Sequence, residues 1–226
     1  MHSSKNENRI LIKSTFHSIS TKLAKAPGKL FLVLFFLMTV TSCQTVLLRL
    51  YGVKNYKIVD EELIFKKAKQ YKVPKEKMYY ADSTYFAYFR SLDTTHKQVV
   101  KDRQQPLQAC YYDRSGNLVS FQINCYAGGF PNLKWNRNGI FKTFVPKQQA
   151  PLDTMLTLNQ HLGFIKPISE ETLIPQEEFD FVVLVHWTVL FGRQSKRLIR
   201  FVQKNAQLAG DKKVDIRYVN MEMMWM

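Results

Sequence analysis

The sequence feature that most constrains the fold is a strand–helix–strand pattern in the last third of the chain. Residues 179–187 form an almost continuous apolar run, which is typical of a strand buried on both faces. Residues 193–209 carry apolar side chains at helical spacing, and Gly210 follows them as a stop signal. Residues 213–220 return to a strand pattern. A helix that joins two such strands forms a right-handed βαβ unit, so the pattern predicts an α/β domain with a parallel strand pair.

A hairpin and three helices are predicted ahead of this unit. Residues 107–125 contain two β-rich runs around a Gly-containing connection, which predicts a hairpin. Asp60 is a suitable N-cap for a helix that ends before Pro74, and a second helix is predicted to begin near Asp82 or Ser83. A third helix is predicted to open at residues 151–153.

The predicted βαβ unit resembles part of a thioredoxin-like domain. Residues 182–194, the helix after them and residues 214–220 are similar to that family's central strand, active-site turn, helix and next strand. The resemblance implies a Cys-x-x-Cys motif in the turn, whose first cysteine is the nucleophile. Here the matching residues are Phe191-Gly192-Arg193-Gln194, so neither position can form a thiolate. A thioredoxin-like domain without this cysteine pair is expected to be redox-inactive.

The resemblance also implies closing strands and a final helix after the βαβ unit. Only six residues follow Asn220, so these elements have no counterpart there. The hairpin of residues 107–125 is the candidate to supply the missing antiparallel strands, although it precedes the βαβ unit in the chain. The candidate ligand-binding residues lie at the carboxyl end of the predicted strand and in the turn after it, where open α/β sheets tend to bind ligands. They are His186, Trp187, Phe191 and Arg193.

The first fifty residues predict where the protein resides. Residues 1–29 contain six basic side chains and one acidic side chain, and an apolar run over residues 30–38 follows. This order is typical of a secretory signal sequence. Val40-Thr41-Ser42-Cys43 then resembles the bacterial lipobox, which implies that Cys43 is acylated and becomes the mature N-terminus. The alternatives are an uncleaved helix over residues 30–50, which is long enough to span a bilayer, and a buried core helix.

The predicted export of the protein changes how its net positive charge is interpreted. The net charge of +15 falls to +10 when residues 1–42 are removed, because they carry six positive and one negative side chain. An exported protein of this charge is expected to face anionic lipid headgroups or polyanionic envelope glycans rather than nucleic acid, for which the sequence has no motif. An envelope protein partner and a simple solvated basic surface stay open as alternatives.

Candidates for chemistry are few. Cys110 and Cys125 are both in the predicted hairpin, where a turn centred on Ser115 places them too far apart for a bridge, so two thiols are favoured over a disulfide. His186 lies at the carboxyl end of a predicted strand and is interpreted as a structural residue before a catalytic one. The histidines and cysteines show no metal-ligand spacing, so no metal or other cofactor is predicted. Residues 128–136 are interpreted as an ordinary connection, with sugar binding as the alternative.

These observations predict an α/β fold with a thioredoxin-like mixed sheet, made of the hairpin and the C-terminal βαβ unit and flanked by helices. Two functions follow as hypotheses. The first is a membrane-anchored envelope lipoprotein whose redox-inactive domain is a binding or assembly module. The second is a thiol-disulfide oxidoreductase or other enzyme that uses Cys110, Cys125 or His186. The predicted division of the chain is a signal peptide (1–42), a tether (43–59), a helical region (60–106) and the thioredoxin-like α/β domain (107–226).

Overall fold

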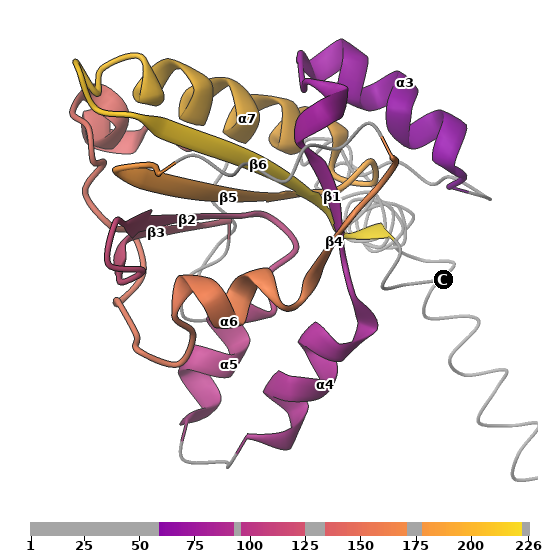
Figure 1. Cartoon of the computed structure of the whole chain (residues 1–226), viewed down its shortest axis with the longest axis horizontal. Helices are drawn as coiled ribbons and strands as arrows, with labels where there is room; N and C mark the ends of the chain where they lie inside the picture. Colours follow the sequence, from indigo (N-terminus) through magenta and orange to yellow (C-terminus); the bar gives the residue numbers. More distant parts are fainter. Residues whose placement is uncertain (1–58, 93–95, 125–133, 171–177, 223–226) are drawn as a thin grey trace, which may run out of the picture. The chain divides into compact units, whose positions relative to one another are not determined.

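The computed structural model describes residues 59–92, 96–124, 134–170 and 178–222, and these residues build one six-stranded mixed sheet with helices on both faces (Figure 1). The predicted α/β fold with a mixed sheet flanked by helices is therefore confirmed. The predicted signal peptide, Cys43, the tether through residue 58, Cys125 and residues 128–133 of the predicted connection lie outside the described residues. Of the rest of that connection, residues 134–136, Trp135 is buried in the core.

The sheet has the strand order β3-β2-β5-β6-β1-β4. β5, β6 and β1 run parallel to one another, whereas β2 is antiparallel to β5, β3 is antiparallel to β2, and β4 is antiparallel to β1. The strands are β1 (Met78–Ala81), β2 (Gln108–Asp113), β3 (Leu118–Ile123), β4 (Ile165–Pro167), β5 (Phe181–Trp187) and β6 (Val214–Asn220).

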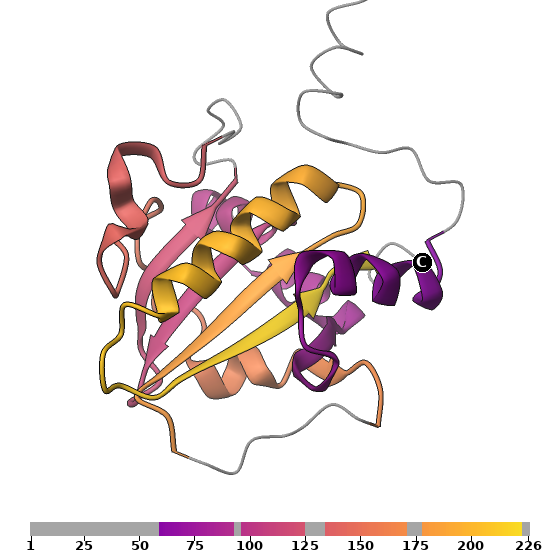
Figure 2. The same ribbon diagram turned by 90° about the horizontal axis from the view of Figure 1, so that it is seen from above.

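The helices form two layers, one on each face of the sheet (Figures 1 and 2). One apolar core lies between the sheet and the first layer, and a second core lies between the sheet and the other layer. The first layer consists of α3 (Glu61–Tyr71), the 3-10 helix η3 (Arg137–Lys142) and α7 (Gly192–Ala206). The second consists of α4 (Ser83–Ser91), α5 (Lys97–Arg103) and α6 (Leu158–Leu162); the 3-10 helix η1 (Lys75–Lys77) leads into β1.

The predicted helix starts at residues 60 and 82 are confirmed by their caps. The Asp60 carboxylate accepts a hydrogen bond from the Leu63 backbone N–H at 2.8 Å, and the Asp82 carboxylate accepts one from the Thr84 backbone N–H at 2.9 Å. Both contacts satisfy backbone donors that the first helical turn leaves without partners. α7 ends at Ala206, three residues before the predicted end, and the chain turns through Gly210 at a φ of 64°.

The predicted βαβ unit and hairpin are also confirmed. β5 and β6 are parallel neighbours in the sheet, and α7 connects them. β2 and β3 form an antiparallel hairpin, and β2 pairs with β5 on the side opposite β6. The hairpin register differs from the predicted one by a single residue, because Cys110 lies opposite Phe121 rather than Ser120. A β-bulge between Tyr111 and Tyr112 causes the shift, since it adds one residue to one strand.

The helix predicted to open at residues 151–153 is wrong. The helix there is α6, which begins at Leu158, because a capping box between Thr157 and Gln160 defines its start. The Asp153 carboxylate accepts a hydrogen bond from the Met155 backbone N–H and pairs with Arg103.

Two short strands were not predicted. β1 lies within residues 60–106, which were expected to be helical, and it pairs with β6 on one side and β4 on the other. The segment therefore contributes helices and also a strand to the same sheet as residues 107–222. β1 has four residues and β4 has three, so neither is long enough to show a periodic pattern in the sequence.

Candidate functional site

The candidate residues of the βαβ unit lie in two different places. Because successive residues of a strand point to opposite faces, His186 lies on the sheet face covered by α4, α5 and α6, and Trp187 lies on the face covered by α3 and α7. Trp187 packs edge-on against Tyr71, with ring centroids 5.8 Å apart. Phe191 is the half-buried N-cap residue of α7, and Arg193 is exposed in the first turn.

His186 belongs to a buried polar cluster that we define by six residues: Arg103, Cys110, Tyr112, Asp153, His161 and His186. Arg103 is fully buried at the end of α5 and forms a two-pronged ion pair with Asp153, in which Nε and Nη2 each lie 3.0 Å from a carboxylate oxygen. Its remaining nitrogen, Nη1, lies 3.4 Å from the Tyr112 hydroxyl and 3.7 Å from the Cys110 Sγ. One guanidinium thus connects the helical layer to two side chains of β2.

The two histidines of the buried polar cluster face one another. Their ring centroids are 5.0 Å apart, and the Tyr85 ring stacks on His161 at 5.5 Å with an interplanar angle of 16°. The His161 Nδ1 lies 2.8 Å from the Tyr112 hydroxyl. The His161 Nε2 and both ring nitrogens of His186 are buried and have no hydrogen-bond partner in the described part of the chain.

Burial keeps both imidazoles neutral. It lowers the pKa of His186 to about 3, with a further lowering from the Arg103 charge. It also holds the pKa of His161 well below its ordinary value, with smaller contributions from His186 and Arg103. Neutral histidines that stay neutral across the physiological range contribute packing and hydrogen bonding, and they do not exchange protons readily.

Cys110 is a free thiol in the same cluster. It is completely buried, and burial raises its pKa to about 12 even though Arg103 favours the thiolate. A thiol in this state is not a nucleophile at neutral pH, since the thiolate is the reactive form. Within the cluster, the ion pair of Arg103 with Asp153 and the contacts of the Tyr112 hydroxyl join the helical layer to β2, while His186 contributes by packing.

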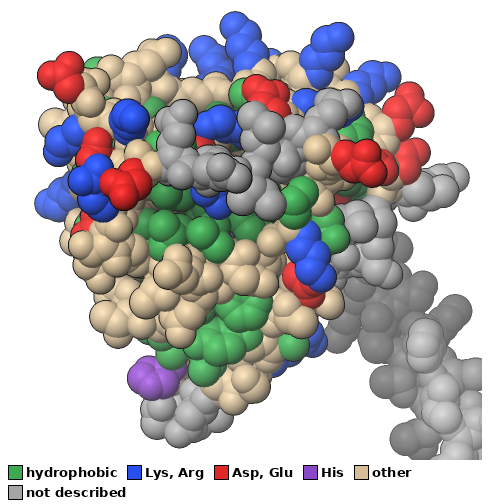
Figure 3. All heavy atoms as spheres, in the orientation of Figure 1, with side chains coloured by type: hydrophobic (Ala, Val, Ile, Leu, Met, Phe, Trp, Pro, Cys, Tyr) green, Lys and Arg blue, Asp and Glu red, His purple; other side chains and the backbone are tan. Residues whose placement is uncertain are grey.

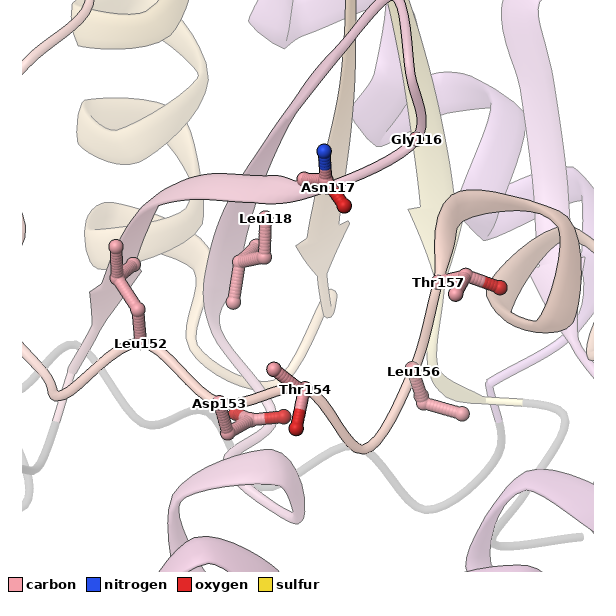
Figure 4. A pocket seen from close by; sticks show the side chains of 8 residues that line it. All are labelled: Gly116, Asn117, Leu118, Leu152, Asp153, Thr154, Leu156 and Thr157. Atoms are coloured by element: carbon pink, nitrogen blue, oxygen red, sulfur yellow. The ribbon is translucent and has the colours of Figure 1, made fainter.

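A shallow pocket reaches this cluster from the surface (Figure 4). Its volume is about 140 Å³, and Asp153 both lines it and pairs with the buried Arg103. Its other walls are the turn between β2 and β3, the first residue of β3, and the loop before α6. The lining residues are Gly116, Asn117, Leu118, Leu152, Asp153, Thr154, Leu156 and Thr157. The polar side chains in this set are able to hydrogen-bond a small polar group, but the volume admits no large ligand.

The turn between β5 and α7 is closed by side chains. The Thr188 hydroxyl accepts hydrogen bonds from the Leu190 and Phe191 backbone N–H groups, at 2.9 and 3.3 Å. The Glu222 carboxylate accepts from the backbone N–H groups of Val189 and Leu190. Glu222 is buried, and burial raises its pKa although these hydrogen bonds act in the opposite direction. Most of the backbone donors that a ligand at this turn would need are thus occupied.

Sequence reasoning did not identify the buried polar cluster. Cys110 and His186 were singled out, whereas Arg103, Tyr112, Asp153 and His161 were not connected with them. The ion pair joins residues fifty positions apart, and the two histidines lie on α6 and β5. No spacing in the sequence gives this juxtaposition, because the sheet order creates it.

Within the described ranges, no group of three or more His, Cys, Asp and Glu side chains is arranged to hold a metal ion. No described helix combines the length and apolar character that crossing a bilayer requires. Comparisons with protein-family models, curated proteins and solved structures give no match to this chain.

Proposed function

We propose that this chain is a membrane-anchored envelope lipoprotein whose thioredoxin-like domain is a redox-inactive binding or assembly module. The observation that carries the proposal is the chemistry at the start of α7. Phe191 and Gln194 occupy the positions at which the resemblance places a cysteine pair, and neither side chain ionises. Cys110, the cysteine among the described residues, lies buried on the opposite face of the sheet with a raised pKa.

The strand order supports the thioredoxin-like part of the proposal. The resemblance implies antiparallel strands beside the central parallel pair, and the β2–β3 hairpin pairs antiparallel with β5 at that place. The hairpin precedes the βαβ unit in the chain, which is a different order of connection from the one that the resemblance implies. β1 and β4 extend the sheet beyond β6, outside the segment that the resemblance covers.

An enzyme that uses Cys110 or His186 is the second candidate. One observation favours it, since both residues belong to the buried polar cluster, which Asp153 links to the surface pocket. The binding module is preferred because both side chains are completely buried and neutral. Catalysis by either group would require the cluster to open first.

We predict that the purified protein does not reduce insulin disulfides, because no thiolate is present at the start of α7. The double substitution Phe191→Cys and Gln194→Cys places a Cys-x-x-Cys pair at the start of α7 and is expected to form a bridge. Mass spectrometry before and after reduction measures the bridge. Disulfide reduction by the parent protein that is lost in Cys110→Ser or Cys125→Ser would overturn the non-catalytic proposal, and turnover lost in His186→Gln alone would indicate another class of enzyme.

We predict that Cys43 carries the lipid. Acyl chains on this cysteine would hold the protein on the membrane, because each buried methylene contributes about 0.8 kcal/mol. Cys43→Ala is expected to abolish incorporation of labelled fatty acid and to leave the precursor uncleaved, which gel mobility and acyl labelling measure. Ser42→Ala is the control that keeps the cysteine. Unchanged labelling in the Cys43→Ala protein would support the spanning helix instead.

A further inference from the structure

The outer side of α7 carries a continuous row of positive charge. Five basic side chains recur at helical spacing along it and all are exposed, and the segment Gly192–Ala206 contains no acidic residue. They are Arg193, Lys196, Arg197, Arg200 and Lys204. Leu198, Ile199 and Val202 on the other side of the helix are fully buried against the sheet, so the helix cannot rotate to redistribute these charges.

Three of these five side chains have no ion-pair partner in the part of the chain that the structure describes. They are Lys196, Arg200 and Lys204. The neighbouring elements of the same layer add more charge, because Lys66 and Lys69 of α3 and several side chains of η3 are exposed. The exposed basic residues of η3 are Arg137 and Lys142. Figure 3 shows the basic side chains gathered along the edge of the molecule where α7 and α3 lie.

The acidic side chains of this layer are confined to one end. Glu61 and Glu62 lie in the first turn of α3, and Lys66 and Lys69 follow them along the helix. In Figure 3 the visible surface over α4, α5 and α6 shows few charged side chains, and the exposed basic residues of these helices are Arg90, Lys97 and Lys101. We use the name basic face for the exposed Lys and Arg side chains of α7, α3 and η3.

We infer that the basic face docks on the anionic phospholipid surface of the membrane that carries the lipid anchor. This inference rests on the proposed anchoring through Cys43. The chain enters the described domain at Val59, directly before α3, and α3 packs against α7. A segment from residue 43 to residue 59 spans at most about 55 Å when fully extended, which lets the basic face reach the headgroups beneath it.

The side chains of the basic face are suited to binding lipid headgroups and not to inserting into the apolar core of the membrane. Adjacent Lys and Arg side chains attract anionic lipid additively within about a Debye length of the surface. Near the basic face, one large apolar side chain of the described residues is exposed. It is Leu208, which is 52% exposed just beyond the end of α7. Docking is therefore expected to depend on charge and on salt, with little insertion.

The test uses the full lipoprotein reconstituted into vesicles of phosphatidylcholine alone and of an equimolar mixture with phosphatidylglycerol. An amine-reactive reagent labels exposed lysines, and mass spectrometry measures the rate at each site. On the anionic vesicles Lys196 and Lys204 are expected to react at least about fivefold more slowly than on neutral vesicles. Lys97 and Lys101 of α5, on the other layer, are expected to react equally on both. Molar salt is expected to remove the difference.

A charge-reversed variant sharpens the test. In the parent protein, Lys66 and Lys69 are also expected to be labelled more slowly on anionic vesicles than on neutral ones. The triple substitution Lys196→Glu, Arg200→Glu and Lys204→Glu is expected to abolish this difference. The matched control reverses three exposed charges on the opposite layer and is expected to keep the protection of Lys196 and Lys204. Its substitutions are Arg90→Glu, Lys97→Glu and Lys101→Glu. Near-ultraviolet circular dichroism verifies that both variants fold.

The outcomes separate the anchor from the basic face. Protein that sediments with neither kind of vesicle would overturn the proposed lipid anchor. Protein that stays on both kinds of vesicle but shows equal labelling at Lys196 and Lys204 would overturn the docking inference alone. Protection of these lysines by a soluble polyanionic glycan and not by anionic vesicles would also overturn it, in favour of a glycan partner.

Discussion

Arg103→Ala is expected to lower the free energy of unfolding by about 3–5 kcal/mol, because it breaks a buried ion pair. The substitution leaves the Asp153 carboxylate without its two-pronged partner and removes a guanidinium that lies 4.7 Å from the Phe121 ring centroid. Arg103 is completely buried, so water cannot replace these contacts without entering the core. Urea unfolding followed by circular dichroism measures the loss.

Arg114→Ala is the matched control, because it also removes an arginine with two carboxylate contacts. The Arg114 guanidinium lies 3.6 Å from Glu178 and from Asp180, and its side chain is 65% exposed. Such a surface pair contributes about 0–1 kcal/mol. Similar losses for Arg103→Ala and Arg114→Ala would show that the buried polar cluster does not stabilise the fold. A double substitution, Arg103→Met with Asp153→Leu, is expected to recover part of the loss, since it removes both charges.

The two buried histidines, which must stay neutral in the folded state, are expected to lower the stability of the domain by up to about 4 kcal/mol as the pH decreases from 7 to 5. The raised pKa of the buried Glu222 carboxyl acts in the opposite direction. The unfolded chain protonates each imidazole below a pH of about 6.5, whereas the folded state resists protonation of His186 until its pKa of about 3. The unfolded state thus binds more protons in this window. The contribution of the two neutral histidines to stability is fully present above a pH of about 6.5. It declines as the pH falls, by up to about 1.4 kcal/mol per pH unit for each histidine.

His186→Phe is expected to halve this dependence on pH, whatever it does to stability at pH 7. The change in slope, and not the stability itself, is therefore the diagnostic measurement, taken from urea unfolding at several pH values. His96→Gln is the control for removing a histidine, because His96 is exposed and its imidazole contacts water in both states. An unchanged slope in both His186→Phe and His161→Phe would contradict the assignment of acid sensitivity to this pair.

Much of the fold was predictable from the sequence where a pattern is long or locally specified. β5 was predicted from an unbroken apolar run, α7 from its amphipathic spacing, and the two capped helix starts from single aspartates. Each of these signals reflects an interaction within a few residues of the position that carries it. The hairpin was predicted with its register wrong by one residue, because nothing in the sequence announces the bulge at Tyr111.

The candidate site was predictable only in fragments. His186 and Cys110 were recognised as chemically capable residues, but their environment depends on Arg103, Tyr112 and His161, which the sheet order brings to them. The orientation of the pair His186 and Trp187 is a further example. Adjacent residues in the sequence lie on opposite faces of β5, so their neighbourhoods have nothing in common.

The order of the strands in the sheet has a consequence for how the chain acquires its structure. β5 and β6 occupy the centre of the sheet, yet they come later in the chain than β2 and β1, the strands that flank them. Met78 of β1 lies opposite Tyr218 of β6, so the strand pairing is dominated by contacts of high contact order, which slow folding. The inner edge of the hairpin therefore stays unpaired until β5 has been synthesised, and that of β1 stays unpaired until residues 214–220 of β6 have been synthesised. The sheet is thus expected to be completed only at the end of synthesis or after it, which is compatible with the export that we propose.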